Sequence, residues 1–376
     1  MNLFWAMRVA LVAFALLFVF ALCTARTQWF ELEEYSFEHY VEEYKKVYDV
    51  EEYAMREKLF NKKLADIRLH NAEQHSWKKG VNHLTDRTTE EFRSMLGYDK
   101  QLGFEFSSRA EPTSMFSAPR DLPAAVDWRE KNIISPIKDQ GQCGSCWTFA
   151  TAESVESYWA MATGRMDTLS EQQIASCTPN PNDCGGTGGC GGGIAEIAYQ
   201  QIIDMGGLSS EWTYPYTSYY GTNRECMFNN KTTPPVAKLQ GYQTLPANEL
   251  TPVMNALSSH GPLAINVDAT AWDDYESGVF TGCDMTNPDI DHVVQLVGYG
   301  TDSSSSQDYW LVRNSWSPSW GEDGYIRLAR ATSNPPCGVD STPQAGTGCN
   351  GGPANVTVCG SCGVLYSVSY PEVIKS

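Results

Sequence analysis

A short polar run at residues 140–147, with two cysteines and a tryptophan, stands directly before the clearest helical pattern of the chain. From Cys146 onward apolar residues recur at intervals of three and four, and the pattern stops at Gly164. This spacing predicts a helix over 146–163 with Cys146 in its first turn. Unpaired backbone N–H groups and the helix dipole favour an anion at that end, so they lower the pKa of a thiol. Cys146 is therefore a candidate nucleophile, provided that a histidine and an orienting group lie near it.

Only two of the six histidines lie in the last two thirds of the chain, His260 and His292. His260 follows a predicted amphipathic helix over 249–259, where a histidine most often acts as a favourable cation at the helix end. His292 begins an apolar run typical of a buried strand, and such a position holds a general base rigidly. Asn314 follows a second predicted strand, and an asparagine there accepts the imidazole N–H and fixes its tautomer. Trp316 is placed to cover that hydrogen bond.

In these motifs and their order, the chain resembles the papain family of cysteine proteases, of the cathepsin L type. The matching features are Cys-Gly-Ser-Cys-Trp after Gln140, the Asp-His pair ending at His292, and Asn-Ser-Trp beginning at Asn314. The resemblance implies Cys146 as nucleophile, His292 as base and later acid, and Asn314 as its orienting residue. It also implies an oxyanion hole formed by Gln140 and the Cys146 backbone N–H. The implied reaction is endoproteolytic hydrolysis through a thioester acyl-enzyme, without a cofactor or a metal.

The resemblance further implies an α+β papain-like fold, in which a helical left domain faces a β-barrel-like right domain across the active-site cleft. An α-helical inhibitory prodomain would precede both. Helical patterns between Cys146 and about Tyr214, and strand-like runs after about Pro235, agree with this division. Active sites commonly occupy such clefts between domains.

The glycine-rich run 185–193 lacks both the Lys-Ser/Thr and the preceding strand of a phosphate-binding loop. The resemblance instead makes part of it a wall for an extended substrate, which pairs with exposed backbone as an added strand. An apolar or aromatic side chain is the expected preference of the adjoining pocket. Asn266 stands where a small apolar residue is usual, so it either admits a polar side chain or bonds to backbone. The implied substrate-binding residues are Gly192, Gly193, Ile194, Ala195, Asn266, Val293 and Trp316.

Residues 1–25 are expected to form a secretory signal peptide, because an apolar stretch over 9–22 precedes small residues suited to cleavage. That stretch is short for a membrane-spanning helix, which needs about 20 residues, and a signal anchor is the alternative. The chain would thus be made as a preproenzyme that meets a membrane only through this signal.

Residues 26–120 are expected to hold an inhibitory propeptide and a linker, and residues 121–376 the mature peptidase domain. Between 37 and 96 the sequence is charged and helical in pattern, and it resembles the interrupted helix signature of the family's prodomain. The matching positions are Glu52, Arg56, Phe60, Ile67 and Asn71, with Lys63 where an asparagine is usual. An attached segment has a high effective concentration, so modest affinity is enough to block the site.

The number of cysteines agrees with export of the protein through the secretory pathway. Cys23 in the leader and the proposed nucleophile Cys146 leave ten of the twelve cysteines, an even number typical of disulfides in an exported chain. The resemblance implies the pairs Cys143–Cys190, Cys177–Cys226 and Cys283–Cys362. Four cysteines remain, with three possible pairings: Cys184, Cys337, Cys349 and Cys359. Three of these lie in a segment at about 332–360, which looks like an insertion and is expected to form two stapled loops.

The net charge of −18 and the pI near 4.7 exclude a nucleic-acid-binding surface, which requires a basic face. The expected partners are peptide and protein substrates and the chain's own propeptide, with the enzyme a monomer. Sequons at Asn230 and Asn355 mark glycosylation sites and fit the secretory pathway. The expected destination is a lysosome, a vacuole or the extracellular space.

Other functional classes explain less of the sequence. A thiol–disulfide oxidoreductase would use Cys143 and Cys146 as a dithiol, and a zinc protein would use the two Cys-Gly-Ser-Cys copies. The redox interpretation leaves Gln140, His292 and Asn314 unexplained, and the zinc interpretation competes with disulfide formation in an exported chain. A catalytically inactive papain-like binding protein would usually lack the nucleophile. An exopeptidase of the family with paired histidines near 220–235 is disfavoured by their absence, although the 332–360 insertion could restrict the cleft.

Overall fold

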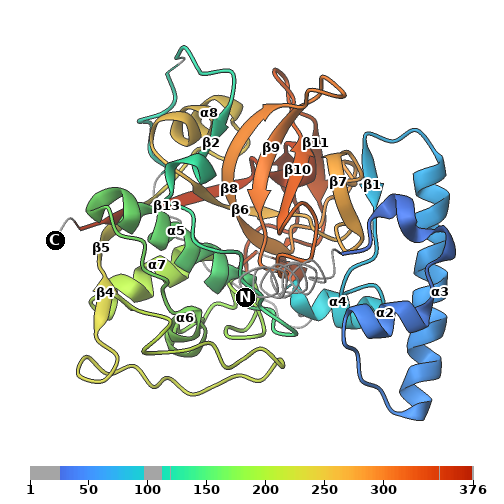
Figure 1. Ribbon diagram of the computed structural model, residues 1–376. Coiled ribbons are helices and arrows are strands. Elements are labelled where there is room, and N and C mark those ends of the chain that lie inside the picture. Colours follow the sequence, from blue (N-terminus) through green and yellow to red (C-terminus); the bar gives the residue numbers. More distant parts are fainter. Residues whose placement is uncertain (1–25, 97–111, 119, 347, 375–376) are drawn as a thin grey trace, which may run out of the picture.

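The computed structural model describes residues 26–96, 112–118, 120–346 and 348–374, so the expected signal peptide and much of the linker lie outside the described residues. Three parts lie side by side: prosegment helices, a helical half and a β half (Figure 1). None of the helices in the described ranges combines the length and hydrophobicity needed to span a membrane.

The helical half is built around one buried helix. Its helices are α5 (Cys146–Thr163), α6 (Glu171–Cys177) and α7 (Ala195–Asp204), joined by the short strands β3 (Leu208–Ser209) and β4 (Pro235–Ala237). Every residue of α5 from Cys146 to Ala160 is buried, and the helix ends at Gly164, whose φ of 71° suits a residue without a Cβ. The predicted bounds of this helix are therefore confirmed.

The β half is one long twisted sheet in the order β1-β7-β10-β9-β8-β6-β13-β5, with β2 paired to β8. Its strands from the mature part are β2 (Val126–Asp127), β5 (Leu239–Thr244), β6 (Leu263–Val267), β7 (Tyr275–Phe280), β8 (His292–Thr301), β9 (Asp308–Arg313), β10 (Tyr325–Ala329) and β13 (Ser367–Val373). Strand β8 is buried from His292 to Gly300, and α5 packs against it. The central strand of the sheet and the central helix thus form the contact between the two halves.

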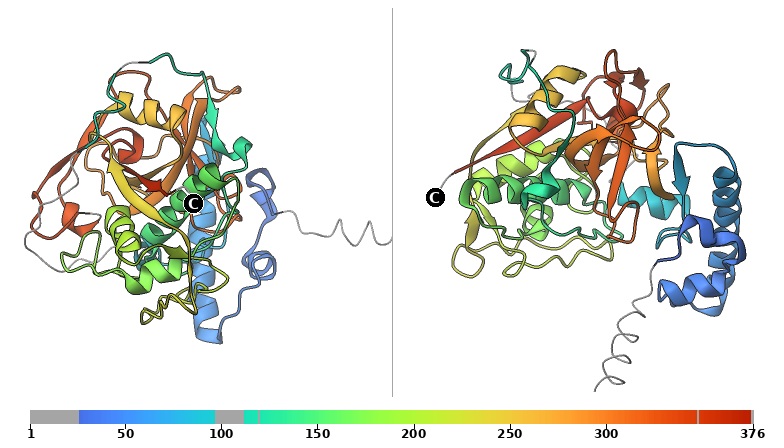
Figure 2. Two further views of the ribbon diagram at one scale, coloured as in Figure 1. Left: turned by 90° about the vertical axis from the view of Figure 1, so that its left-hand side faces the viewer. Right: turned by 45° about the horizontal axis from the view of Figure 1, so that its top comes forward.

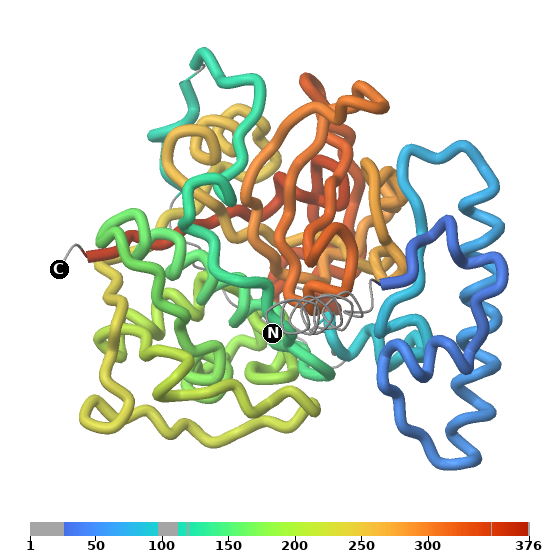
Figure 3. The backbone as a smooth tube through the Cα atoms, in the orientation of Figure 1, coloured from blue at the N-terminus to red at the C-terminus, as the bar shows by residue number. Residues whose placement is uncertain are grey.

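Helix α8 (Leu250–Ser259) is followed by His260, as predicted, but the surroundings of His260 disfavour its cationic form. Its ring lies among Phe116, Tyr158 and Tyr370, and burial lowers its pKa below the usual value. The segments 112–118 and 120–140 lead from beside α8 to the start of α5 (Figure 3). A 3-10 turn, η2 (Trp128–Lys131), lies within it.

The prosegment stands against the outer edge of the β half, as Figure 2 shows from a second direction. Its elements are η1 (Trp29–Glu34), α2 (Phe37–Glu43), α3 (Val50–Ala72), β1 (Trp77–Lys79) and α4 (Thr89–Met95). Strand β1 extends the enzyme's sheet by pairing with β7. Gly278 of β7 permits this pairing, because a Cβ there would lie 2.4 Å from the carbonyl oxygen of Ser76, and its φ is 93°.

Basic prosegment residues face acidic residues of the enzyme at this edge. Lys63 pairs with Asp273, Lys79 with Asp274 at 3.0 Å, and Arg26 with Glu276 at 3.6 Å. Lys63, which replaces the usual asparagine, therefore contributes a salt bridge between the two parts of the chain.

The cysteine-rich insertion holds β11 (Cys337–Asp340), η3 (Pro343–Ala345) and β12 (Val356–Cys359), and the 3-10 turn η4 (Ser361–Gly363) follows it. The described residues form five disulfides, among them the three implied pairs. Cys337–Cys359 closes the β11–β12 hairpin, whereas Cys349 pairs with Cys184 of the helical half. The expectation of two stapled loops is therefore wrong for one of them, because its disulfide partner lies 165 residues away in the sequence.

A buried group of charges joins the two halves beneath α5. Arg313, at the end of β9, lies 3.3 Å from Glu153 of α5, and their side chains are 0% and 1% exposed. Lys138 pairs with Glu156 and Glu171 nearby. Burial raises the pKa of Glu153 to about 7 despite the Arg313 charge. Buried charges of this kind are costly to leave unpaired.

Replacing Arg313 by methionine should therefore destabilise the precursor by about 3–5 kcal/mol, since Glu153 loses its partner in the interior. Chemical denaturation of a Cys146→Ala precursor measures this change. The double variant Arg313→Met, Glu153→Met should lose less stability than the sum of the losses in the two single variants. Arg165→Met, which removes an exposed pair with Asp167, is the control and should change stability by less than about 1 kcal/mol. Equal losses at Arg313 and Arg165 would contradict this account.

Candidate active site

Cys146 is the first residue of α5 and is 2% exposed. The helix N-cap, Ser145, makes no side-chain capping hydrogen bond, so it leaves the backbone N–H groups of Cys146 and Trp147 to other partners, whereas the Thr148 N–H donates to the Ser145 carbonyl oxygen. Among the described residues, Cys146 is the one cysteine outside a disulfide. Cys143 is joined to Cys190, so Cys146 has no neighbouring thiol with which to form a redox pair.

The environment of the thiol differs from the sequence-based expectation. Burial raises the pKa of Cys146 to about 12, and hydrogen bonds from the backbone at Val293 and Trp147 oppose this only in part. The expected lowering of the thiol pKa is therefore wrong for this state of the chain. Loss of hydration outweighs the helix terminus, because no cation accompanies the buried sulfur.

His292 begins β8 and is fully buried. Its Nε2 lies 2.8 Å from Oδ1 of Asn314, and an amide oxygen can only accept a hydrogen bond, so Nε2 carries the proton. The other ring nitrogen, Nδ1, is buried without a hydrogen-bond partner. Burial lowers the pKa of His292 to about 4. The ring is thus neutral, with a basic nitrogen left unbonded.

The histidine and the cysteine meet where α5 packs against β8. Val293, the residue after His292, forms the backbone hydrogen bond to the Cys146 thiol and packs in the same apolar cluster as Cys146. Trp316 covers the other side, with its ring centroid 4.8 Å from that of His292. The two halves of the molecule thus bring these residues together.

The Gln140 side chain is fully engaged. Its Nε2 donates to the backbone oxygens of Cys143 and of Met95, each at 2.8 Å, and its Oε1 accepts a hydrogen bond from Ser315 at 2.6 Å. Met95 is the last residue of prosegment helix α4. A prosegment carbonyl therefore lies against the amide that the resemblance assigns to the oxyanion hole.

The end of α4 was not identified from the sequence as part of the site. Phe92, Met95 and Leu96 are buried. The ring of Phe92 packs edge-on against that of Trp316, with 5.3 Å between the ring centroids. The available signal was a capping box from Thr88 to Glu91 followed by apolar residues. It marks a helix but does not indicate where that helix docks.

The residues expected to contact substrate lie on two walls. On the helical side, Gly192 has a φ of 94°, and a Cβ on Gly193 would lie 2.6 Å from the Trp147 ring, so glycine is required for this close approach. On the β side, Asn266 of β6 lies opposite Val293 of β8. Ile194, Ala195, Asn266 and Val293 are all buried.

No group of three potential metal ligands occurs in the parts of the chain that the structure describes. The two Cys-Gly-Ser-Cys copies contribute their other three sulfurs to disulfides with Cys190, Cys283 and Cys337. The sulfurs of the two copies therefore do not form a zinc site. The oxidised pairs also indicate an oxidising compartment.

Residues 122–347 match the family described as papain family cysteine protease, and residues 37–92 match the cathepsin propeptide inhibitor domain (I29). Germination-specific cysteine protease 1 of Arabidopsis thaliana is 37% identical over 292 residues, covering 75% of this chain and 74% of that protein. Procathepsin L of Rattus norvegicus is 36% identical over 306 residues, covering 79% and 86% respectively.

Among solved structures, digestive procathepsin L 3 of Tenebrio molitor larval midgut has a TM-score of 0.71 at 31% identity, covering 92% of this chain and 100% of that chain. Recombinant stem bromelain precursor has a TM-score of 0.69 at 31% identity, covering 89% and 97%. Both share the mixed α+β architecture with an N-terminal helical propeptide. The chain belongs to the papain family of cysteine proteases, and it is a cysteine endopeptidase made as a proenzyme with a cathepsin-type propeptide.

Proposed function

We propose that Cys146, His292, Asn314 and Gln140 carry out peptide-bond hydrolysis in this endopeptidase. The hydrogen bond of 2.8 Å between His292 Nε2 and Asn314 Oδ1 carries the proposal, because it leaves Nδ1 as the basic nitrogen. The backbone hydrogen bond from Val293 to the Cys146 thiol supports it further, since it keeps the sulfur beside the residue that follows His292.

With the prosegment withdrawn, His292 Nδ1 takes the proton of the Cys146 thiol, and the sulfur attacks the carbonyl carbon of the substrate. Gln140 Nε2 and the Cys146 backbone N–H stabilise the charge that develops on the carbonyl oxygen. The imidazolium then protonates the leaving amine, and a thioester remains on Cys146. Water, deprotonated by His292, hydrolyses that thioester. Asn314 holds the ring in the required tautomer throughout.

The substrate segment before the cleaved bond pairs with the backbone at Gly192 and Gly193, in this proposal, as an added strand. Ile194 and Ala195 on one wall, and Asn266 and Val293 on the other, line the adjoining side-chain pocket. Phe92 of the prosegment packs against the Trp316 ring. Removal of the prosegment would expose this ring, so it would face the substrate in the mature enzyme.

The proenzyme is kept inactive in two ways. The Met95 carbonyl takes the hydrogen bond that Gln140 would give to the oxyanion. The thiol and the imidazole are also both neutral between about pH 4 and pH 12, because burial raises the pKa of Cys146 and lowers that of His292. Readmitting water on prosegment release favours the charged pair that nucleophilic attack requires.

We further assign residues 1–25 to a signal peptide, 26–120 to the propeptide and linker, and 121–376 to the mature enzyme. Residues 120–125 are exposed, as a cleaved junction must be. The exposed Asn230 and Asn355 suit glycosylation in the secretory pathway. The enzyme would act as a monomer in a lysosome, a vacuole or the extracellular space.

Substitutions at the three central residues should give graded losses. Cys146→Ser should abolish peptide hydrolysis while the precursor still folds, and Asn314→Ala should reduce kcat less than His292→Ala, because Asn314 orients the base rather than transferring the proton. Steady-state kinetics on a fluorogenic peptide measure these losses. Substantial turnover by Cys146→Ser, or equal losses at Asn314 and His292, would overturn the assigned roles.

Gln140→Ala should lower kcat by about 10²–10³ with a smaller change in KM, since the lost donor acts mainly in the transition state. The same kinetic assay measures the effect in the processed enzyme. Gln142→Ala, two residues away and exposed, is the control and should retain activity. A Gln140 variant that affected only KM would contradict the oxyanion assignment.

The pH response of the proenzyme follows from two carboxylates inside the prosegment. Two hydrogen bonds from Arg56 lower the pKa of Glu91. Burial raises the pKa of Asp86, but the Lys46 charge and hydrogen bonds from Tyr48, Lys46 and Tyr40 outweigh it, so the net shift is downward. Such groups stabilise the folded prosegment above their unfolded pKa values, near 4, and that stabilisation is lost as pH falls through the lower folded values.

Asp274 acts in the opposite direction. Burial and the neighbouring Asp273 raise its pKa to about 7, so relative to the unfolded chain its protonation on acidification favours the folded precursor. We therefore expect acid release to begin below about pH 4 and to depend on Glu91 rather than Asp274.

In a Cys146→Ala precursor, Glu91→Gln should lower the Tm at pH 7 and reduce the difference in Tm between pH 7 and pH 3.5. Differential scanning calorimetry measures both values. The neighbouring Glu90, which is exposed, provides the control, and Glu90→Gln should leave the pH dependence unchanged. An undiminished pH dependence in Glu91→Gln would exclude this residue as the acid-sensitive group.

A further inference from the structure

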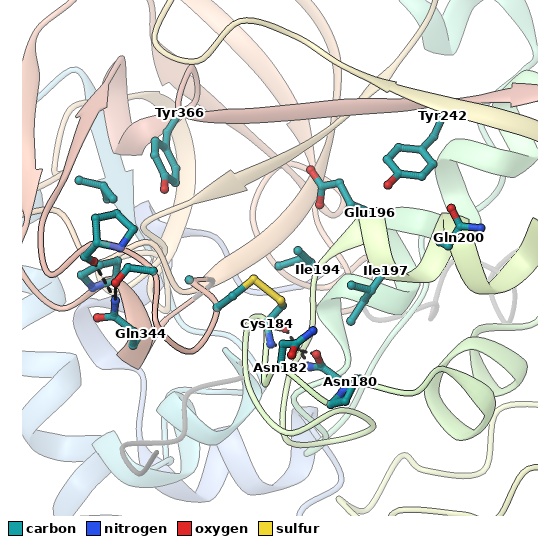
Figure 4. A pocket seen from close by; sticks show the side chains of 17 residues that line it. Asn180, Asn182, Cys184, Ile194, Glu196, Ile197, Gln200, Tyr242, Gln344 and Tyr366 are labelled. Carbon is teal, nitrogen blue, oxygen red and sulfur yellow. Dashed lines mark hydrogen bonds between the residues drawn. A yellow bond between two sulfur atoms is a disulfide. The ribbon is translucent and has the colours of Figure 1, made fainter. Parts of the chain in front are cut away.

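A cavity of about 620 Å³ lies between the start of α7, strand β5 and the cysteine-rich insertion (Figure 4). Ile194, Ile197 and Tyr242 line it on one side, and Tyr366 and Val356 on the other. Ile194 also belongs to the proposed substrate wall, but Ala195, Asn266 and Val293 do not line this cavity. The cavity is therefore adjacent to, but distinct from, the pocket assigned above.

The insertion builds the outer side of the cavity by crossing between the two halves of the enzyme. At its β-half end, Asp340 Oδ2 accepts a hydrogen bond from the Ile290 backbone N–H at 3.5 Å. At its helical-half end, the Cys184–Cys349 disulfide and a hydrogen bond from Gly185 N–H to Gly348 O, at 3.0 Å, fix the chain. We call the described residues 340–346 and 348–350 the strap.

Both attachment points of the strap adjoin the proposed active site. Ile290 lies two residues before His292, and Gly185 lies so close to Gly193 that an added Cβ would be 2.5 Å from the Gly193 carbonyl oxygen. The strap therefore spans from the β wall to the substrate-pairing backbone. A cavity beneath it is within reach of a side chain of a substrate paired at Gly192 and Gly193.

The chemistry of the lining favours a cation. Glu196, in the first turn of α7, has its Oε2 atom buried without a hydrogen-bond partner, and Figure 4 shows its carboxylate between Tyr242 and Tyr366. The described residues that line the cavity include no lysine, arginine or histidine. A buried carboxylate oxygen without a partner is unfavourable, so a ligand that brings a charged donor is stabilised there. The tyrosine rings suit both an aliphatic stem and a guanidinium face.

We propose that this cavity is an additional specificity pocket, which takes a lysine or arginine side chain of the substrate from a position before the cleaved bond. Glu196 is the anionic partner, and the apolar walls hold the aliphatic stem. The inference rests on the proposed function, because the direction of the substrate follows from its pairing at Gly192 and Gly193.

The test uses the mature enzyme obtained by processing of the full precursor. Matched fluorogenic peptides carry arginine, lysine, norleucine or glutamate at each of the four positions before the cleaved bond, and kcat/KM is measured for each. At one position we expect arginine or lysine to exceed norleucine by roughly tenfold, the factor that a charge-assisted hydrogen bond supplies. Norleucine has the stem of lysine without the charge, so the ratio isolates the electrostatic contribution.

Glu196→Gln should reduce that ratio toward one while leaving cleavage of the norleucine peptide unchanged, and Glu196→Lys should shift the preference toward glutamate. Glu225→Gln, an exposed charge removal in the same half, is the control and should keep the wild-type ratio. Gln200→Trp, at an exposed position lining the cavity, should abolish the basic preference by filling it.

The outcomes separate the two proposals. If the wild-type enzyme cleaves norleucine peptides but shows no preference for arginine or lysine, the specificity pocket is refuted and the catalytic assignment stands. The same conclusion follows if Glu196→Gln and the wild type show equal preferences for arginine or lysine. Failure of the wild-type enzyme to cleave any peptide would overturn the proposed function and, with it, the pocket. Loss of the norleucine activity in Glu196→Gln would place the residue in the general integrity of the site and would also refute its role in specificity.

Discussion

The packing of α5 against β8 is the contact on which the rest of the molecule depends. Both elements are almost completely buried, and they come from different halves, so each half completes the core of the other. The first residue of the helix and the first residue of the strand are the cysteine and the histidine of the site. Because the same apolar contact that stabilises the fold also sets their separation, the geometry of the pair does not rely on flexible loops. The buried Arg313–Glu153 pair lies at the same junction, where each charge compensates for the other in the interior.

Burial also explains how the proposed catalytic pair, Cys146 and His292, stays unreactive before processing. A thiol and an imidazole that are both shut off from water remain neutral, since neither ion is solvated and no fixed charge compensates for it. The prosegment reinforces this state through one backbone carbonyl on Gln140 and through an apolar ring on Trp316. Neither contact requires a prosegment side chain to touch the proposed nucleophile, Cys146.

The sequence sufficed for features that depend on local pattern. The bounds of α5, the strand that begins at His292 and the general α+β division follow from periodicity, Gly164 and the motif at 140–147. It did not suffice where distant segments meet. The partner of Cys349 lies 165 residues away, the docking of Met95 depends on tertiary structure, and the neutral His260 reflects three aromatic rings from separate elements. The thiol pKa was misjudged for the same reason, because desolvation is a property of the assembled core and not of one helix end.

The strap has a mechanical consequence for the mature enzyme. It joins the β half at Asp340 and the helical half at Cys349, and the disulfide to Cys184 makes the second attachment covalent. The main chain also crosses between the halves elsewhere, and they share the α5–β8 contact, so the strap adds a restraint to a junction that is already packed. Because its two attachments adjoin Ile290 and Gly193, it limits how far the walls beside them can move apart. That end of the groove would then act as a fixed reference that sets how a bound chain is aligned.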